Sequence, residues 1–304
     1  MLSRFVLAAF LLALTFPSLH AQAPEVNVKE DVIYGRKYGV SLTMDVFTPN
    51  SNKNGAAVIM VASGGWVSAK EMVNRAFFNE MLKRGYVVFV VVHGSQPKFT
   101  IPEILEDMNR SVRYIRYHAK DYGIDPDRIG IIGASAGGHL SLMQGCASQE
   151  GKPQAKDPVD RVSSKITAVG CFFPPTDFLN YRKPGNVELG TGSIKDFWPP
   201  FDFHTYEGKK GFIAVSDEEK RKEIGKKISP IYHVTKETAP TLIIHGDADQ
   251  LVPIQQAEIM IAKLKENNVP CELVTKKGMA HGWVGIDKDI VTIADWFDKY
   301  LAKK

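Results

Sequence analysis

The sequence predicts an α/β fold with a mostly parallel central sheet of about eight strands and helices on both faces. Short apolar, β-branched runs alternate with longer helical patterns from about residue 28 onward, which is the main observation behind this prediction. Most of the short runs are apolar along their whole length, as expected for strands that are buried on both faces. No linker, repeat or low-complexity tract divides the chain, so residues 24–304 are predicted to form a single domain.

The predicted sheet begins with an antiparallel hairpin at its edge, in which residues 28–34 and 40–47 flank a turn at residues 35–39. Six further strands are predicted at residues 57–62, 87–92, 128–132, 168–173, 241–245 and 271–275. Helices are predicted at residues 75–84, 102–122, 136–147, 255–267 and 289–301. Because helices separate most of these strands, the connections suit a parallel sheet.

One long stretch, at about residues 176–229, interrupts this alternation between two predicted strands. It is rich in aromatic residues and ends in a charged helical pattern at residues 217–227. The aromatic residues include Phe197, Trp198, Phe201, Phe203, Tyr206 and Phe212. Such an insertion within one domain is typical of a cap or lid, so we expect a cap-like insertion rather than a second domain.

The N-terminal residues have the pattern of a secretory signal peptide. Arg4 precedes an apolar run at residues 5–16, and small residues that suit a signal peptidase follow. We place the signal peptide at residues 1–21, with cleavage after Ala23 as the alternative. The apolar run is too short for a transmembrane helix, which needs about 20 residues. The sequence therefore predicts a secreted or periplasmic protein with no stable membrane anchor.

Composition and motif content argue against several classes of function. The formal net charge is only +4 and no long basic run is present, so we expect no nucleic-acid partner. Three widely spaced cysteines are too few for a disulfide scaffold or a zinc site. The chain also lacks the H-E-x-x-H, G-x-x-x-x-G-K-[ST] and G-x-G-x-x-G motifs. We therefore expect neither a metal nor a cofactor.

The segment RIGIIGASAGGH at residues 128–139 is the most informative part of the chain. A predicted strand ends at Gly133, Ser135 occupies a sharp turn, and a helix follows, which is the setting of the G-x-S-x-G nucleophile elbow. Gly133 and Gly137 have no side chains, so the strand and the helix can approach closely. The N-terminus of the helix also places a positive dipole beside the serine. Ser135 is therefore the candidate nucleophile.

A serine nucleophile needs a histidine base and a carboxylate, which follow this motif in the order Ser, Asp, His. The strand at residues 241–245 leads into the loop HGDADQLVP, which holds Asp247 and Asp249. We assign Asp249, because the residue before the Gln-Leu-Val-Pro turn is better placed to reach across the sheet edge, whereas Asp247 suits a role within the loop. His281 lies in a glycine-flanked loop after the last predicted strand and is the candidate base.

Ester or amide hydrolysis also needs hydrogen-bond donors for the developing oxyanion. After the predicted strand at residues 57–62 the chain reads SGGW, in which consecutive glycines leave backbone N–H groups accessible. The candidate donors in this turn are the N–H groups of Gly64, Gly65 and Trp66. The N–H of Ala136, directly after the serine, is the further candidate.

These motifs make the chain resemble the α/β-hydrolases of the esterase and lipase branch. It is similar to hormone-sensitive-lipase-like esterases, to feruloyl and acetyl-xylan esterases, and to prolyl-oligopeptidase catalytic domains. The resemblance extends over nearly all of the mature chain and includes MDVFTP at residues 44–49, YGIDPDRI at 122–129, GASAGGH at 133–139 and SPIYHV at 229–234. It implies an α/β-hydrolase fold and a cofactor-free serine carboxylic-ester hydrolase that forms an acyl-enzyme on Ser135. The implied substrates are small-molecule or polysaccharide esters.

The chain departs from this resemblance at two places. The His-Gly-Gly-Gly pattern usual in these esterases reads Ala62-Ser-Gly-Gly here, and His93-Gly-Ser-Gln-Pro replaces a common tyrosine–arginine pattern. Two alternative functions stay open. One is a serine peptidase like prolyl oligopeptidase, although the chain has no residues for the large propeller of such enzymes. The other is a noncatalytic binding module on a hydrolase scaffold, which has no reason to retain all three catalytic residue types.

Overall fold

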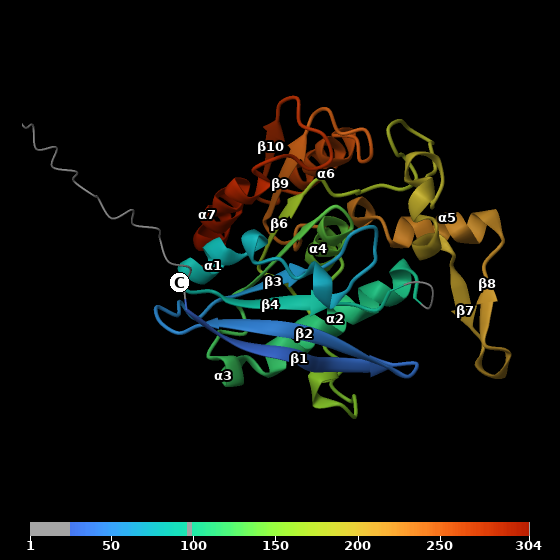
Figure 1. Ribbon diagram of the computed structural model, residues 1–304. Coiled ribbons are helices and arrows are strands. Elements are labelled where there is room, and N and C mark those ends of the chain that lie inside the picture. Colours follow the sequence, from blue (N-terminus) through green and yellow to red (C-terminus); the bar gives the residue numbers. More distant parts are fainter. Residues whose placement is uncertain (1–24, 96–98, 304) are drawn as a thin grey trace, which may run out of the picture.

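A central sheet of eight strands forms the middle of the molecule (Figure 1). Its strands are β1 (Val26–Lys37), β2 (Val40–Pro49), β3 (Ala57–Val61), β4 (Val87–Val92), β5 (Ile129–Ala134), β6 (Ala168–Phe172), β9 (Thr241–Gly246) and β10 (Cys271–Lys276). The computed structural model describes residues 25–95 and 99–303, so the predicted signal peptide lies outside the described residues.

The strand order in the sheet is β1-β2-β4-β3-β5-β6-β9-β10. β1 pairs with β2 and β2 pairs with β4 in antiparallel register, whereas all the other neighbours are parallel. The prediction of a mostly parallel eight-stranded sheet with an edge hairpin is confirmed. All parallel strands therefore end at the same edge of the sheet, where the loops after β3, β5, β9 and β10 meet.

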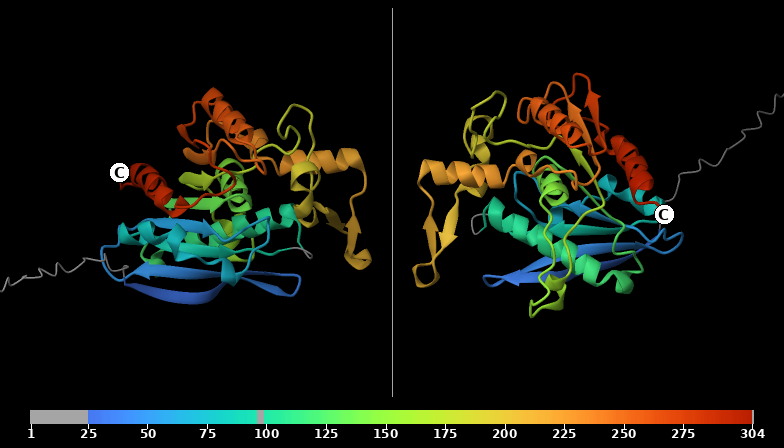
Figure 2. Two further views of the ribbon diagram at one scale, coloured as in Figure 1. Left: turned by 45° about the horizontal axis from the view of Figure 1, so that its top comes forward. Right: turned by 180° about the vertical axis from the view of Figure 1, so that it is seen from behind.

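Helices cover both faces of the sheet (Figure 2). They are α1 (Asn79–Lys83), α2 (Ile101–Tyr117), α3 (Ala119–Tyr122), α4 (Ala136–Cys146), α6 (Gln255–Glu266) and α7 (Ile290–Tyr300). Strand side chains alternate between two apolar cores, because successive residues of a strand point to opposite faces. Ile59 and Phe89 belong to the core under α2, α4 and α6, whereas Val58 and Val88 belong to the core under α1 and α7.

The edge hairpin is longer and its turn tighter than the sequence predicted. β1 and β2 stay paired as far as Lys37 and Val40, so the turn consists of Tyr38 and Gly39 rather than residues 35–39. Both turn residues have positive φ values, 47° and 82°, as a two-residue hairpin turn of type I′ requires. Gly35 lies inside β1 next to a register shift instead.

Two predicted helices are broken in the structure. The predicted helix at residues 75–84 is a 3-10 turn at Arg75–Phe77 followed by α1, because Phe78 between them has a non-helical φ of −144°. The predicted helix at residues 102–122 divides into α2 and α3 at His118. No helix within residues 25–95 and 99–303 is both long and apolar enough to cross a bilayer.

The segment between β6 and β9 contains the insertion predicted at residues 176–229. It holds the 3-10 helices η4 (Gly192–Phe197) and η5 (Pro199–Phe201), the strands β7 (His204–Tyr206) and β8 (Phe212–Ala214), and the helix α5 (Glu218–Lys227). β7 and β8 form a small separate antiparallel hairpin that stands away from the central sheet (Figure 1). The sequence patterns did not predict this hairpin, because each of its strands has only three residues.

A buried aromatic cluster attaches the insertion to the sheet. The Trp66 indole, after β3, lies 5.8 Å from the Phe178 ring and 5.1 Å from the Phe201 ring, measured between centroids. Its Nε1–H donates to Nδ1 of His139 on α4 at 3.1 Å. The His139 Nε2–H donates to the Ile228 carbonyl at 2.6 Å, so the imidazole is neutral and links both partners.

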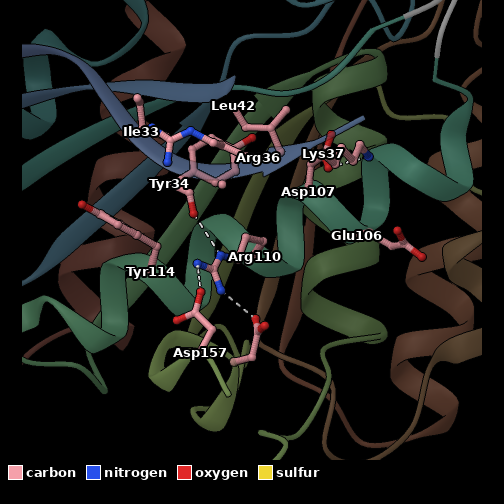
Figure 3. A pocket seen from close by; sticks show the side chains of 12 residues that line it. Ile33, Tyr34, Arg36, Lys37, Leu42, Glu106, Asp107, Arg110, Tyr114 and Asp157 are labelled. Atoms are coloured by element: carbon pink, nitrogen blue, oxygen red, sulfur yellow. Dashed lines mark hydrogen bonds and ion pairs between the residues drawn. The ribbon is translucent and has the colours of Figure 1, made fainter. Parts of the chain in front are cut away.

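Ion pairs and a hydrogen bond of Arg110 connect several elements beside a cavity of 460 Å³ (Figure 3). Arg110 of α2 donates to the Tyr34 carbonyl of β1 at 2.9 Å. The same guanidinium pairs with Asp157 and Asp160, at 2.6 and 2.8 Å. These bonds join β1, α2 and the loop after α4.

We expect His139 to make stability depend on pH. Burial lowers the pKa of His139 to about 4, and its hydrogen bond to the Ile228 carbonyl opposes this only in part. An unfolded histidine has a pKa of about 6.5, so between pH 6.5 and pH 4 the unfolded chain binds a proton that the native chain does not. The free energy of unfolding therefore falls as the pH is lowered through this window.

Thermal unfolding followed by near-UV circular dichroism between pH 7 and pH 4.5 measures this effect. Tm should fall less steeply in His139→Gln than in the wild type, although the variant is less stable at pH 7. His118→Gln, at a partly exposed histidine, serves as the control and should keep the wild-type pH dependence. An unchanged slope in His139→Gln would contradict the prediction.

Candidate active site

Ser135 lies at the tip of the turn between β5 and α4, in a backbone conformation that is rare for residues other than glycine. Its φ is 53° and its ψ is −118°. A Cβ atom on Gly133 would lie 2.3 Å from the Gly137 carbonyl oxygen, so only glycine fits at this crossing. A Cβ on Gly137 would lie 2.9 Å from the Val61 carbonyl oxygen. The close approach of strand and helix thus holds the serine hydroxyl outward at the edge of the sheet.

The structure brings together the serine, histidine and aspartate that the sequence selected. Nε2 of His281 lies 2.9 Å from Oγ of Ser135, and Nδ1 of His281 lies 2.7 Å from Oδ2 of Asp249. Because a carboxylate only accepts hydrogen bonds, Nδ1 carries the proton and Nε2 presents a lone pair to the hydroxyl. Such an arrangement can activate the hydroxyl as a nucleophile.

Asp249, rather than Asp247, contacts the imidazole of His281. Oδ1 of Asp249 accepts the backbone N–H groups of Leu251 and Val252, both at 2.9 Å, and the side chain is buried. Asp247 is exposed and accepts the N–H of Gly278 at 2.5 Å, so it holds the loop that carries His281.

Hydrogen bonds keep the buried carboxylate of Asp249 ionised. Burial by itself raises the pKa of Asp249, but hydrogen bonds from His245 and His281 outweigh it and hold the pKa well below its usual range. His245 is itself fully buried, and its Nε2 lies 2.8 Å from the Val252 carbonyl and 3.4 Å from Oδ2 of Asp249. His245 thus supports the loop of the aspartate.

Aromatic side chains fix the position of the His281 ring. The ring centroid of Phe173, which follows β6, lies 4.4 Å from that of His281. Trp283 packs on Phe173 with centroids 5.7 Å apart, and its Nε1–H donates to Asp289 at 2.8 Å. The side chain of His281 remains 21% exposed, so a substrate can reach it from one side.

Residues 64–67, which we call the glycine turn, lie after β3 at the same edge of the sheet. Gly64 and Val67 exchange two backbone hydrogen bonds of 3.0 Å, and the residues between them, Gly65 and Trp66, have φ values of 55° and 60°. The N–H of Gly64 is therefore engaged inside the turn, contrary to the expectation that it is an accessible donor. Among the described residues, the N–H groups of Gly65 and Trp66 have no hydrogen-bond partner.

Ala136 is the first residue of α4, so its N–H has no acceptor within the helix. It is therefore a further candidate oxyanion donor.

The insertion also packs against the glycine turn. A Cβ on Gly65 would lie 2.5 Å from the ring of Phe197, so this ring packs directly against the turn. The neighbouring Trp198 is 53% exposed. The site is thus bordered by the glycine turn and by α4, and the Phe197 ring of the insertion packs against the turn.

Sequence reasoning missed the histidines that support the site. The sequence patterns assign no functional role to His139 or His245, yet both are fully buried and bond to residues beside the candidate site. The available signal was a polar residue at the end of an otherwise apolar run, as at His245 in the segment TLIIHG. Their partners are distant in the chain or belong to irregular loops, so spacing did not reveal them.

The BD-FAE family model matches residues 44–264, which is well over half of the chain. Among curated relatives, the probable carboxylic ester hydrolase LipM of Mycobacterium tuberculosis is 23% identical over 240 residues, 78% of this chain and 51% of the relative. An isoprenylcysteine alpha-carbonyl methylesterase of Arabidopsis thaliana is 22% identical over 260 residues, 84% of this chain and 56% of that protein. The chain therefore spans about half the length of these relatives.

Solved structures share the fold over nearly its whole extent. A truncated carbohydrate esterase from gut microbiota has a TM-score of 0.74 and 25% identity, covering 93% of this chain and 99% of that one. An acetyl ester-xyloside bifunctional hydrolase from Caldicellulosiruptor lactoaceticus has a TM-score of 0.70 and 22% identity, covering 92% and 98%. With the elbow at Ser135 and the matched family model, these likenesses identify the chain as an α/β-hydrolase that belongs to the BD-FAE family.

Proposed function

We propose that this chain is a serine carboxylic-ester hydrolase that works through an acyl-enzyme on Ser135. The observation that carries the proposal is the continuous pair of hydrogen bonds from Ser135 through His281 to Asp249. The names of the curated relatives and of the structural neighbours, which are ester hydrolases and carbohydrate esterases, point in the same direction.

In the proposed reaction, Oγ of Ser135 attacks the ester carbonyl carbon while its proton passes to Nε2 of His281. The carbonyl oxygen becomes an oxyanion, for which the N–H groups of Gly65, Trp66 and Ala136 are the proposed donors. Collapse of this intermediate breaks the bond to the alcohol, which leaves with the proton from His281. Water then attacks the acyl-serine by the same route and releases the acid.

Asp249 supports these reaction steps by staying ionised. When His281 takes the proton of Ser135, the imidazolium lies beside a full negative charge at 2.7 Å. The low pKa of Asp249 means that the proton stays on His281 and is available to the leaving alcohol.

We further propose that the substrates are esters of small molecules or polysaccharides and that the protein is exported, as its N-terminal residues indicate. The exposed indole of Trp198 supports a carbohydrate or phenolic substrate, because such rings stack on aromatic side chains. Two structural neighbours, a carbohydrate esterase and an acetyl ester-xyloside bifunctional hydrolase, favour sugar esters within this range.

Ser135→Ala should abolish turnover of p-nitrophenyl esters, with a loss of kcat on the order of 10⁶-fold. The assay follows p-nitrophenolate release over a series from acetate to laurate, with circular dichroism to verify folding. The chain-length profile reports the size of the acyl pocket. A fluorophosphonate probe should label the wild type and spare the variant.

Three outcomes would contradict this function in different ways. Ester turnover that persists in folded Ser135→Ala would exclude Ser135 as the nucleophile. Faster cleavage of proline-containing peptide amides than of matched esters would favour the peptidase alternative. A wild type that neither turns over esters nor reacts with fluorophosphonate would favour a noncatalytic binding module.

Asp249→Asn should lower kcat by about 10⁴-fold, because an amide NH₂ group facing Nδ1 favours the wrong tautomer of His281. The KM for p-nitrophenyl acetate should change little, since Asp249 is buried and does not reach a bound substrate. Asp247→Asn is the matched control two residues away and should cost less than about tenfold in kcat. Equal losses in the two variants would contradict the assignment of Asp249.

Trp198→Ala tests the substrate class. If the indole stacks on a sugar ring, KM for acetylated xylo-oligosaccharides should rise by up to about tenfold. The kcat/KM for p-nitrophenyl acetate should stay within about twofold of the wild type, because this ester does not need the stacking surface. Tyr117→Ala, which removes a comparably exposed aromatic ring on α2, serves as the control. An unchanged KM for the oligosaccharide would contradict a sugar-binding role for Trp198.

A further inference from the structure

The two places where the sequence departs from its esterase relatives lie in contact with each other. Ser63 stands where the usual His-Gly-Gly-Gly pattern has its first glycine, and His93 begins the segment that replaces the tyrosine–arginine pattern. In the structure, Nε2 of His93 lies 2.8 Å from Oγ of Ser63. Both side chains are buried, His93 at 3% and Ser63 at 9% exposure, so water does not compete for this bond.

The hydrogen bond between these two residues has a defined direction. Nδ1 of His93 lies 2.6 Å from the Gly94 carbonyl oxygen, which only accepts, so Nδ1 carries the proton. Nε2 therefore accepts the hydroxyl proton of Ser63. Burial lowers the pKa of His93 to about 4, which keeps the imidazole neutral and this donor–acceptor arrangement intact at neutral pH.

Ser68 reinforces the same connection at the other end of the glycine turn. Its hydroxyl donates to the Ala62 carbonyl at 2.5 Å and accepts the backbone N–H of His93 at 3.2 Å. The N–H of Ser68 donates to Oγ of Ser95 at 2.8 Å. Residues 93–95, directly after β4, therefore hold Ser63 and Ser68, which lie on either side of the glycine turn.

The segment after β4 is in turn fixed to a buried ion pair. The N–H of Gly94 donates to Oδ2 of Asp107 on α2 at 2.9 Å, and Oδ1 of Asp107 pairs with Lys37 of β1 at 2.6 Å (Figure 3). A Cβ on Gly94 would lie 2.6 Å from the ring of Phe99 and 2.9 Å from the Asp107 carboxylate. Gly94 thus permits a close approach that a side chain would prevent.

We propose that His93 is a positioning residue, which acts through Ser63 to fix the glycine turn so that the N–H groups of Gly65 and Trp66 face the oxyanion. This inference rests on the proposed esterase function. Oxyanion donors stabilise a transition state only if they are held in place before the reaction, and both donors belong to a turn whose own pairing is limited to Gly64 and Val67. The imidazole of His93, directly after β4, thus stabilises the turn from outside.

The test compares His93→Ala, Ser63→Ala and the double variant with the wild type, using p-nitrophenyl acetate. We expect each single variant to lower kcat by about tenfold or more, with KM within about twofold, because the turn acts on the transition state. The double variant should lose no more than the worse single variant, since both remove the same hydrogen bond. His93→Gln can place an amide oxygen near the position that Nε2 occupies in the wild type, so it should keep most of the activity that His93→Ala loses.

One further measurement and one control variant separate positioning from general stability. The second-order rate of fluorophosphonate labelling, which needs no ester turnover, should fall in parallel with kcat. Ser63→Ala removes a single oxygen atom and provides a folded variant if His93→Ala unfolds. His118→Ala is the histidine control and should leave kcat unchanged, because His118 lies at the C-terminal end of α2, where its Nδ1 lies 2.7 Å from Oδ2 of Asp121.

Each outcome decides the proposal. Folded variants of both residues with wild-type kcat and labelling rates would overturn it, while leaving the ester-hydrolase function intact. The proposal would also be overturned if the loss of kcat in the double variant equalled the product of the two single fold-losses, because the two side chains would then act separately. A wild type without Ser135-dependent turnover or labelling would instead remove the proposed function, and the inference with it.

Discussion

The close contact between β5 and α4 is the steric constraint on which the rest of the site depends. Gly133 and Gly137 leave no room for a Cβ, and a Cβ on Gly138 would lie 2.9 Å from the Phe172 carbonyl oxygen. The same carbonyl accepts the N–H of Ser135 at 3.0 Å, so β6 also fixes the turn. These contacts hold Ser135 at a positive φ and place the first N–H of α4 beside its hydroxyl. One tight crossing therefore positions both the nucleophile and a candidate oxyanion donor.

The parallel sheet determines where the other components meet. β3, β5, β9 and β10 run in the same direction, so the loops after their carboxyl ends gather at one edge. The loop after β9 then carries a charge into a buried position, which is costly unless donors surround it. Asp249 has such donors in two backbone N–H groups and two histidines, and the net effect is a lowered pKa. The carboxylate can therefore be both buried and ionised.

The sequence predicted the fold, and it selected Ser135, Asp249 and His281, which the structure brings together, because their signals are local and strong. Apolar runs such as Val87–Val92 differ sharply from helical patterns, and the glycines around Ser135 identify a steric requirement directly. The β7–β8 hairpin was missed, because three-residue strands carry too little periodicity to detect. The accessible donors of the glycine turn were also not resolved by sequence, since whether Gly64 pairs with Val67 depends on the φ values of the residues between them.

The histidines show most clearly why residue identity alone does not reveal a role. His93, His139 and His245 are buried, and each uses a ring nitrogen to bond a backbone carbonyl, which sets the tautomer. The second nitrogen accepts a hydrogen bond from Ser63 in His93 and from Trp66 in His139, whereas that of His245 has no partner among the described residues.

His281 differs in two respects. Its Nδ1 lies 2.7 Å from the Asp249 carboxylate, closer than the 3.4 Å of His245, and its Nε2 faces a hydroxyl at an accessible edge. A carbonyl fixes an imidazole, but a carboxylate also stabilises the imidazolium that forms when a proton is taken up. The buried histidines are thus suited to hold loops in place, and His281 is suited to move a proton. This distinction depends on which oxygen lies opposite each ring, and that follows from the packing of the loops rather than from the sequence around each histidine.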